Sequence, residues 1–185
     1  MNKPFQLALL ALCAWLPAAF AQHAGAIHQG HGQTAPTTHA QGPYAGMQGR
    51  AIKALSEQQL SDLRGGKGMS LALPAELNGY PGPSHALELA EALKLTAEQK
   101  SRTQTLFAQM QQEAKAAGEE VIAAEAALDA LFKTKAATLG ALRTATHDAA
   151  LAQGQLRETH LRYHLAMVDL LSPEQVAAYN RMRGY

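Results

Sequence analysis

One apolar pattern limits the folds open to this chain of 185 residues. Between residues 107 and 131 apolar side chains recur in alternating steps of three and four, which places them on one stripe of an α-helix. The stripe consists of Phe107, Met110, Ala114, Ala117, Val121, Ala124, Leu128 and Leu131. A second stripe with the same steps consists of Leu139, Leu142, Thr146, Ala149, Gln153, Leu156, His160, Tyr163, Met167 and Leu170. Together they predict two long helices that pack along each other.

The composition favours the same fold class. The chain holds 38 Ala and 26 Leu but only 6 Val or Ile, and β-sheets depend on β-branched and aromatic residues. Residues 133–137 are the expected turn, with arms of about 35 residues or ~50 Å on either side. We therefore predict an all-α fold: a long antiparallel helical hairpin with short flanking helices. Because a hairpin alone buries little surface, we expect the short helices or a second copy, in a homodimer, to cover it.

A motif of the form L-[ST]-x-x-Q occurs at 55–59, 95–99 and 171–175. Its hydroxyl can accept a hydrogen bond from the backbone N–H three residues on, while the Gln side chain reaches back to the first N–H. This arrangement is a capping box. The motif predicts three helix starts, after Ser56, Thr96 and Ser172. The motif residues beside the hairpin are Leu95, Thr96, Gln99, Leu171, Ser172 and Gln175.

The first 21 residues have the pattern of a signal peptide. Lys3 precedes an apolar run over 7–16, and Ala19-Phe20-Ala21 fits the small-x-small cleavage rule. The run is too short to span a bilayer. Lipid attachment at Cys13 is an alternative, although Leu12 is larger than the residue a lipoprotein signal favours there. We expect cleavage after Ala21 and a periplasmic protein.

The remaining chain divides into three parts. Residues 22–49 are rich in Gly, Gln, Thr, His and Pro and predict a disordered tail. Its histidines could capture metal ions loosely, and they are His23, His28, His31 and His39. Residues 50–83 predict short helices and a Pro/Gly loop, and 84–185 the hairpin domain. Within this domain Ser84 is expected to cap a short helix that runs through Lys94.

Histidines carry the chemistry that the hairpin offers. His160 and His164 stand four residues apart, and Met167 follows three residues later. Such a histidine pair can hold a divalent ion, and a thioether favours softer ions. The candidate ligands are His85, His160, His164 and Met167, for Zn, Ni, Co or Cu, provided that His85 folds back toward His160. A structural role is the alternative, with His160 hydrogen-bonded across the hairpin and Met167 in the core.

These features resemble the periplasmic Spy/CpxP-like proteins with L-T-x-x-Q motifs, which include ZraP/CnrX-type heavy-metal resistance proteins and refolding chaperones. The resemblance rests on the signal peptide and on the motifs at 95–99 and 171–175, and it covers 84–185 well and 44–83 more loosely. It implies a non-enzymatic dimer that binds unfolded clients or metal ions in the envelope. The CnrX-like sensors carry His-x-x-x-Met before the last motif. Here Met167 matches the methionine, but Tyr163 stands at the histidine position.

The sequence is compatible with two alternative functions from different classes. A client-binding chaperone would expose apolar side chains among charged ones, and the candidates are Leu87, Leu106, Ile122, Leu151, Leu161 and Leu165. A metal-responsive protein would scavenge ions or act as the sensor for a membrane-bound sensor or anti-sigma partner. A third interpretation is a helical envelope protein without a metal role.

Other classes are not expected. The chain has no Gly-rich phosphate loop, no nucleophile-elbow serine and no carboxylate pair in a catalytic context, so we do not expect an enzyme or a required cofactor. The 16 Lys and Arg are balanced by 15 Asp and Glu. Nucleic-acid binding needs a clustered basic field, so we expect no nucleic-acid partner.

Overall fold

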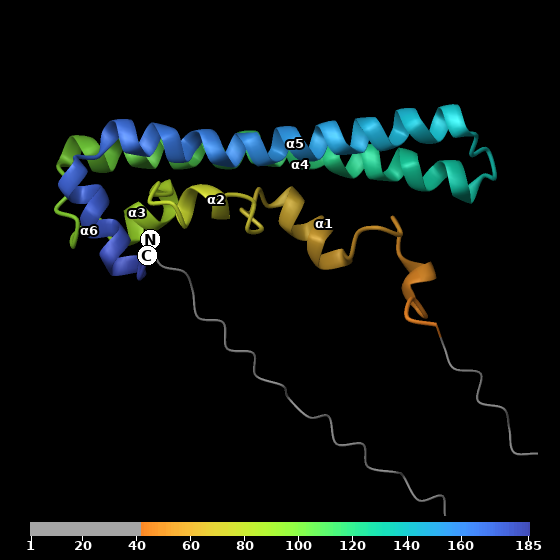
Figure 1. Ribbon diagram of the computed structural model, residues 1–185, viewed down its shortest axis with the longest axis horizontal. Helices are drawn as coiled ribbons and strands as arrows, with labels where there is room; N and C mark the ends of the chain where they lie inside the picture. The colour runs from red at the N-terminus through yellow and green to blue at the C-terminus, as the bar shows by residue number, and fades with distance from the viewer. Residues whose placement is uncertain (1–41) are drawn as a thin grey trace, which may run out of the picture. The chain divides into compact units, whose positions relative to one another are not determined.

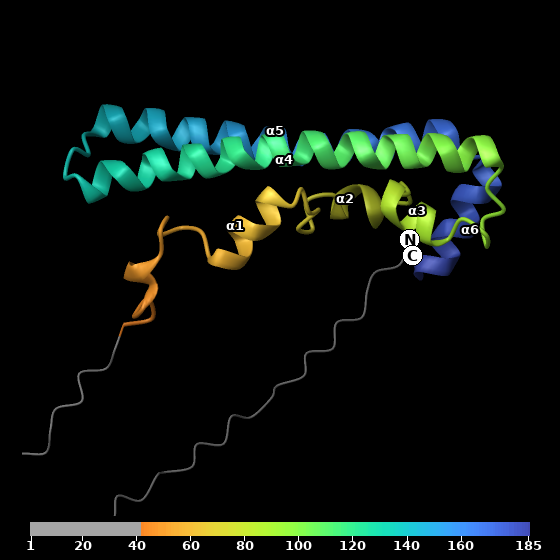
Figure 2. The ribbon, with the colours of Figure 1, turned by 180° about the vertical axis from the view of Figure 1, so that it is seen from behind.

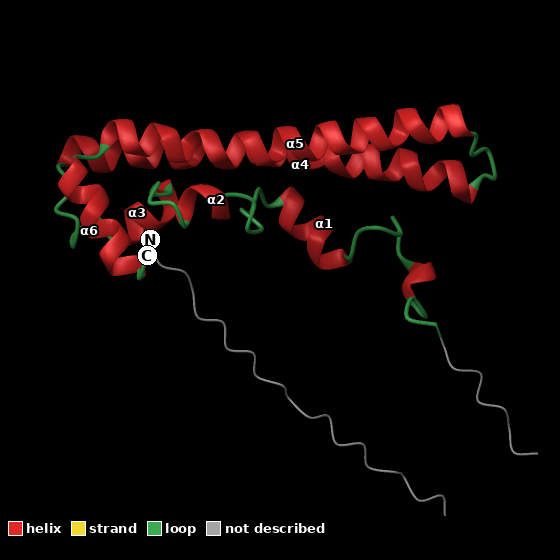
Figure 3. Cartoon of the chain, viewed as in Figure 1, coloured by secondary structure: helices red, strands yellow, loops and turns green. Residues whose placement is uncertain are grey.

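The computed structural model describes residues 42–185 (Figure 1). The regular elements of this part of the chain are all helices, and no strand occurs in it (Figure 3). They are the 3₁₀ helix η1 (Met47–Gly49) and the α-helices α1 (Glu57–Arg64), α2 (Leu73–Glu76), α3 (Pro83–Glu88), α4 (Ala97–Lys133), α5 (Leu139–Leu170) and α6 (Pro173–Arg183). The fold is all-α, as the sequence predicted.

The two longest helices form the predicted antiparallel hairpin. Helices α4 and α5 have 37 and 32 residues and pack along each other. The short helices α1, α2 and α3 follow one side of the pair, and α6 folds back at its open end (Figures 1 and 2). The turn lies at residues 134–138, where Lys135 adopts a left-handed φ of 60° and Thr138 caps α5. The short helices therefore cover part of the hairpin within a single chain.

The three capping boxes form as predicted. In each motif the Ser or Thr hydroxyl accepts from the backbone N–H of the Gln three residues later, and that Gln side chain accepts from the N-cap N–H. Helices α1, α4 and α6 therefore begin where the motif placed them. The reason is local: the motif satisfies two N–H groups that a helix start otherwise leaves free.

The short helix before the hairpin differs from its prediction. Helix α3 begins at Pro83, which occupies its preferred first position, so Ser84 is not the cap. The helix also ends at Glu88 rather than at Lys94. Residues 89–94 form turns instead, which bury Leu93 against the open end of the hairpin, 3 % exposed, and end at Lys94 with a left-handed φ of 52°.

Burial along the two stripes is uneven. The stripes are covered from the open end to about the middle of the hairpin, where Ala114, Val121 and Leu156 are buried. Near the turn they are not, and Leu139 is 71 % exposed. Periodicity predicted the helices correctly but not this difference, because burial there depends on a third element. The N-terminal segment reaches only as far as Asp129, which accepts a hydrogen bond from the N–H of Lys53.

Two apolar clusters hold the short elements on the hairpin. The first joins the segment around α1 to the middle of the hairpin and consists of Ile52, Leu55, Leu60, Leu63, Ala114, Val121, Ile122, Ala152 and Leu156. Ile122 is therefore buried rather than available to a client, contrary to its expected role. The second cluster ties α3 and α6 to the open end and consists of Ala86, Leu93, Met167, Leu171 and Tyr179.

Several sequence predictions concern the N-terminal part of the chain. The signal peptide, and the tail histidines His23, His28, His31 and His39, lie outside the described residues. Residues 42–49 form turns and η1, closed by backbone hydrogen bonds such as Ala45 N–H to the Gly42 carbonyl. The structure gives turns to this short stretch, which the sequence assigned to the disordered tail. Over residues 42–185 no helix combines the length and apolar character needed to cross a membrane.

Candidate functional site

A cavity of about 370 Å³ lies between the N-terminal segment and the hairpin. Three of the four predicted metal ligands line it, namely His85 from α3 and His160 and His164 from α5. The fourth, Met167, does not line it. Met167 is 0 % exposed and packs in the second apolar cluster. The folding back of the short helix, on which the approach of His85 depended, does occur.

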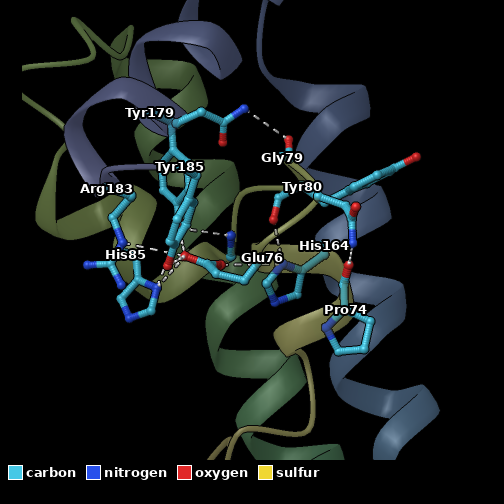
Figure 4. A network of polar contacts seen from close by, with 12 residues as sticks. Pro74, Glu76, Gly79, Tyr80, His85, His164, Tyr179, Arg183 and Tyr185 are labelled. Atoms are coloured by element: carbon cyan, nitrogen blue, oxygen red, sulfur yellow. Dashed lines mark hydrogen bonds and ion pairs between the residues drawn. The ribbon is translucent and has the colours of Figure 1, made fainter. Parts of the chain in front are cut away.

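A buried carboxylate, Glu76 at the end of α2, lies between two of these histidines (Figure 4). Its Oε1 lies 3.1 Å from Nδ1 of His85 and accepts a hydrogen bond from the hydroxyl of Tyr179. The guanidinium of Arg183 lies 3.5 Å from the same oxygen. The Arg183 guanidinium and the hydroxyl of Tyr179 offset the cost of burying this carboxylate. The network also joins α2 and α3 to α6.

The second oxygen of Glu76 is free. Within the described part of the chain, buried Oε2 has no hydrogen-bond partner. The nearest titratable nitrogen is Nδ1 of His164, 3.7 Å away. A buried carboxylate oxygen without a donor is costly, so it marks a place where a cation would be stabilised.

A backbone carbonyl from a distant loop orients the ring of His164. Its Nδ1 lies 2.7 Å from the carbonyl oxygen of Tyr80, in the loop between α2 and α3. A carbonyl only accepts, so Nδ1 carries the proton and Nε2 of the neutral ring keeps a lone pair. Metal-bound histidines commonly hold their second nitrogen in this way. A Cβ at Gly82 would lie 2.9 Å from Cε1 of His164, so the close approach requires glycine.

His160 presents a second imidazole nitrogen to the site. The residue is 2 % exposed, and its Nε2 has no hydrogen-bond partner among residues 42–185. Burial, and then the charge of His164, lower the pKa of His160 below its ordinary value. The ring is therefore neutral at pH 7, which is the form that binds metal ions. The predicted hydrogen bond across the hairpin is not made through this nitrogen.

The donors line one cavity without forming a complete ligand shell. Across residues 42–185 no three His, Cys, Asp or Glu side chains are arranged to hold a metal ion as they stand. Three donors are available among the residues that line the cavity. They are Nε2 of His164, whose ring the Tyr80 carbonyl orients, Nε2 of His160 and Oε2 of Glu76. An ion could use these donors after small side-chain movements, or it would need donors of another type.

Sequence reasoning missed several residues of this site. Glu76 and Tyr80 come from α2 and the loop after it, whereas Tyr179 and Arg183 come from α6, so the two pairs are distant in sequence. No pattern marks Glu76 as buried, since it lies in a four-residue helix between loops. The capping residues Gln99 and Gln175 join the start of α4 to the start of α6 and do not line the cavity.

Comparison with known proteins adds no relative. No protein-family model matches the chain, and neither the curated proteins nor the solved structures contain a significant match. The resemblance to Spy/CpxP-like proteins therefore stays a prediction from the sequence motifs.

Proposed function

We propose that this protein is a non-enzymatic, exported binding protein of the Spy/CpxP-like type that takes up a metal ion in heavy-metal tolerance or envelope stress. The observation that carries the proposal is the pair of imidazoles in one cavity. His164 is held by the Tyr80 carbonyl with Nε2 left free, and His160 has a buried Nε2 without a partner. Two free nitrogens one helical turn apart are the usual start of a metal site.

The surroundings support a cation rather than a neutral ligand. The free Oε2 of Glu76 lines the same cavity and provides negative charge. His85 is held on the opposite oxygen of Glu76 and adds a further imidazole. When bound, an ion would supply the positive charge that this oxygen lacks. The protein's own residues supply position, through the Tyr80 carbonyl, and selectivity, through the type of donor.

The place of action is part of the same proposal. The N-terminal pattern of charge, apolar run and small residues supports export and cleavage, and therefore the periplasm. The capping motifs before α4 and after α5, both at the open end of the hairpin, support the Spy/CpxP-like assignment. In such a role the protein would act as a homodimer, as a scavenger or as the sensor for a membrane-bound partner.

Client binding is a second candidate, favoured by apolar surface on the hairpin. Four large side chains of the hairpin are more than half exposed, namely Phe132, Leu139, Leu151 and Leu165. Exposed apolar groups between charged ones can hold unfolded chains with little specificity. Leu151 and Leu165 were expected in this role from the sequence.

The metal proposal is tested by titration of the full chain with its four tail histidines replaced by alanine. Zn(II), Ni(II), Co(II) and Cu(I) are added separately and followed by calorimetry. We expect one ion per chain, with affinity at least about tenfold weaker in His160→Ala and, for a divalent ion, also in His164→Ala. His147→Ala, an exposed histidine on the same helix, is the matched control and keeps the affinity. Failure of every ion to bind would refute the proposal.

Client binding has its own test. The full chain is added to a reduced, unfolding model protein, and light scattering records aggregation. Suppression that weakens in Leu151→Ser with Leu165→Ser, but not in Gln155→Ser on the same helix, supports the chaperone role. Absence of suppression at a molar excess removes it.

A further inference from the structure

We propose that the ion selected by this cavity is copper(I), held by the thioether sulfurs of Met69 and Met110 together with the imidazole of His160. The inference rests on the proposed metal-binding function and names its ligand class. It adds two donors that the sequence did not single out. Met167, the methionine that the sequence did single out, takes no part.

Two methionines line the cavity that the histidines share. Met110 projects from α4 and is partly buried, and Met69 comes from the loop between α1 and α2, 36 % exposed. With His160 from α5, the three donors come from three different segments of the chain. An ion bound to all three would tie the loop to both arms of the hairpin.

The backbone at Met69 is unusual. Met69 and Ser70 are consecutive non-glycine residues with left-handed φ values of 44° and 62°. Each such residue is less favourable than one in ordinary backbone. A strained conformation of this kind is more common at ligand sites than elsewhere. Here the left-handed residue is a methionine that lines the cavity. Gly68, the residue before Met69, could have adopted a left-handed turn without this cost.

The donor set favours a soft ion. Zn(II) prefers four ligands drawn from imidazole, thiolate and carboxylate. No three such side chains are arranged for an ion over residues 42–185, and the one cysteine, Cys13, lies in the expected signal peptide. Thioethers are neutral, soft donors that select copper(I), which is satisfied by two or three ligands. Met69, Met110 and His160 provide that number.

The charge of the cavity also fits a monovalent ion. Besides its polar groups the cavity is lined by apolar side chains such as Leu73 and Phe107. Burying a divalent ion among neutral ligands there would cost more than burying a monovalent one. The free Oε2 of Glu76 lines the same cavity and can balance a single positive charge without coordinating it.

The first test observes the sulfur donors directly. The full chain, with its four tail histidines replaced by alanine, is labelled with ¹³C at the methionine methyl groups and titrated with Ag(I), a stand-in for Cu(I) that undergoes no redox change. The chain contains six methionines, so individual signals can be assigned by substitution. We expect the Met69 and Met110 signals to shift together up to one equivalent, while Met167 and Met182 stay unchanged. Unchanged Met69 and Met110 signals in the presence of bound ion would overturn the proposal.

The second test separates this proposal from the general one. Cu(I) affinity is measured by competition with a chromophoric copper(I) chelator. Met69→Leu and Met110→Leu, which conserve volume, are expected to weaken it at least about tenfold. Exposed Met182→Leu is the matched control and should change nothing. If divalent ions bind through His160 and the Met substitutions have no effect on Cu(I), the copper assignment is wrong and the metal function stands. If no ion binds, both fail.

Discussion

The side-chain amides of Gln99 and Gln175 bond each other in both directions. Gln99 Nε2 donates to Gln175 Oε1 at 2.8 Å, and Gln175 Nε2 donates to Gln99 Oε1 at 3.0 Å. Each oxygen also accepts from its own N-cap N–H, and each nitrogen also donates to a backbone carbonyl, that of Leu170 or of Leu93. The pair joins the start of α4 to the start of α6. It therefore gives the repeated motif a tertiary role beyond capping.

This pairing requires an amide at both positions. Gln175→Glu keeps the capping acceptor but removes both donors and places a negative charge beside Gln99 Oε1. We expect a loss of about 1–3 kcal/mol in the free energy of unfolding, because two partly buried acceptors lose their donors. Urea denaturation measures it.

The control is Gln59→Glu in the first capping box. Gln59 Oε1 accepts from the N–H of Ser56, and glutamate serves that position equally well. A change of less than about 0.5 kcal/mol is expected there. Equal losses in the two variants would show that the reciprocal pair adds nothing to capping.

A glycine in α4 allows α1 to approach closely. A Cβ at Gly118 would lie 2.5 Å from the carbonyl oxygen of Leu63, so Gly118→Ala forces the backbone of α1 away. We expect destabilisation of about 1–3 kcal/mol. Gly154 in α5 has nothing within 4 Å of its added Cβ. Gly154→Ala should stabilise the protein by about 0.5–1 kcal/mol, since alanine is the better helix former. Chemical denaturation of both variants checks the opposite signs.

The buried His160 predicts a loss of stability in mild acid. Its pKa is lowered by burial and by His164, so the unfolded chain takes up this proton near pH 6.5 and the folded chain only at lower pH. Between these two values the unfolded state binds more protons, and the free energy of unfolding falls as the pH falls. One such group contributes at most about 1.4 kcal/mol per pH unit.

His160→Gln should remove this part of the slope, because glutamine does not titrate. His147→Gln, on the exposed side of the same helix, should keep it. The measurement is urea denaturation at a series of pH values on both sides of pH 6.5. A slope that is the same in His160→Gln and in the parent would contradict the assignment.

The raised pKa of Tyr179 leads us to predict a loss of stability in alkali. Burial, followed by its hydrogen bond to Glu76, raises the pKa of the phenol well above its ordinary 10.0. Above pH 10.0 the unfolded chain therefore loses this proton first, and the free energy of unfolding falls as the pH rises. Tyr179→Phe should flatten that slope and cost about 1–2 kcal/mol at neutral pH, through the lost hydrogen bond to Glu76.

Ultraviolet absorbance titration checks the same point. In the folded protein the last phenol to ionise should be absent from Tyr179→Phe and present in Tyr44→Phe, since Tyr44 is 76 % exposed. Ionisation of every tyrosine at its ordinary pKa in the folded protein would rule out a buried, hydrogen-bonded Tyr179.

The candidate site could be predicted only in part. The spacing of His160 and His164 placed both on one helix, and they do line one cavity. The approach of His85 could be stated only as a condition on how the short helix folds. No sequence pattern marked Glu76 or the Tyr80 carbonyl as part of the site, because their contacts in it are with residues distant in sequence.

Local chemistry by itself determined the two long helices and the starts of α1, α4 and α6. The stripe from Phe107 to Leu131, the turn after Lys133 and the capping boxes at Ser56, Thr96 and Ser172 all depend on residues within a few positions of one another. Such interactions can be read from spacing alone. The same holds for the all-α class, which follows from many Ala and Leu and few β-branched residues.

Only the tertiary structure decided which surfaces are covered. The side of the hairpin that carries Ile122 is buried because α1 packs there, whereas Leu139 stays exposed because the N-terminal segment does not extend to the turn. In the same way Met167 became core and Met69 and Met110 line the cavity. The physical reason is that burial and ligand convergence depend on which distant segments meet, and a periodic pattern contains no information on its partner.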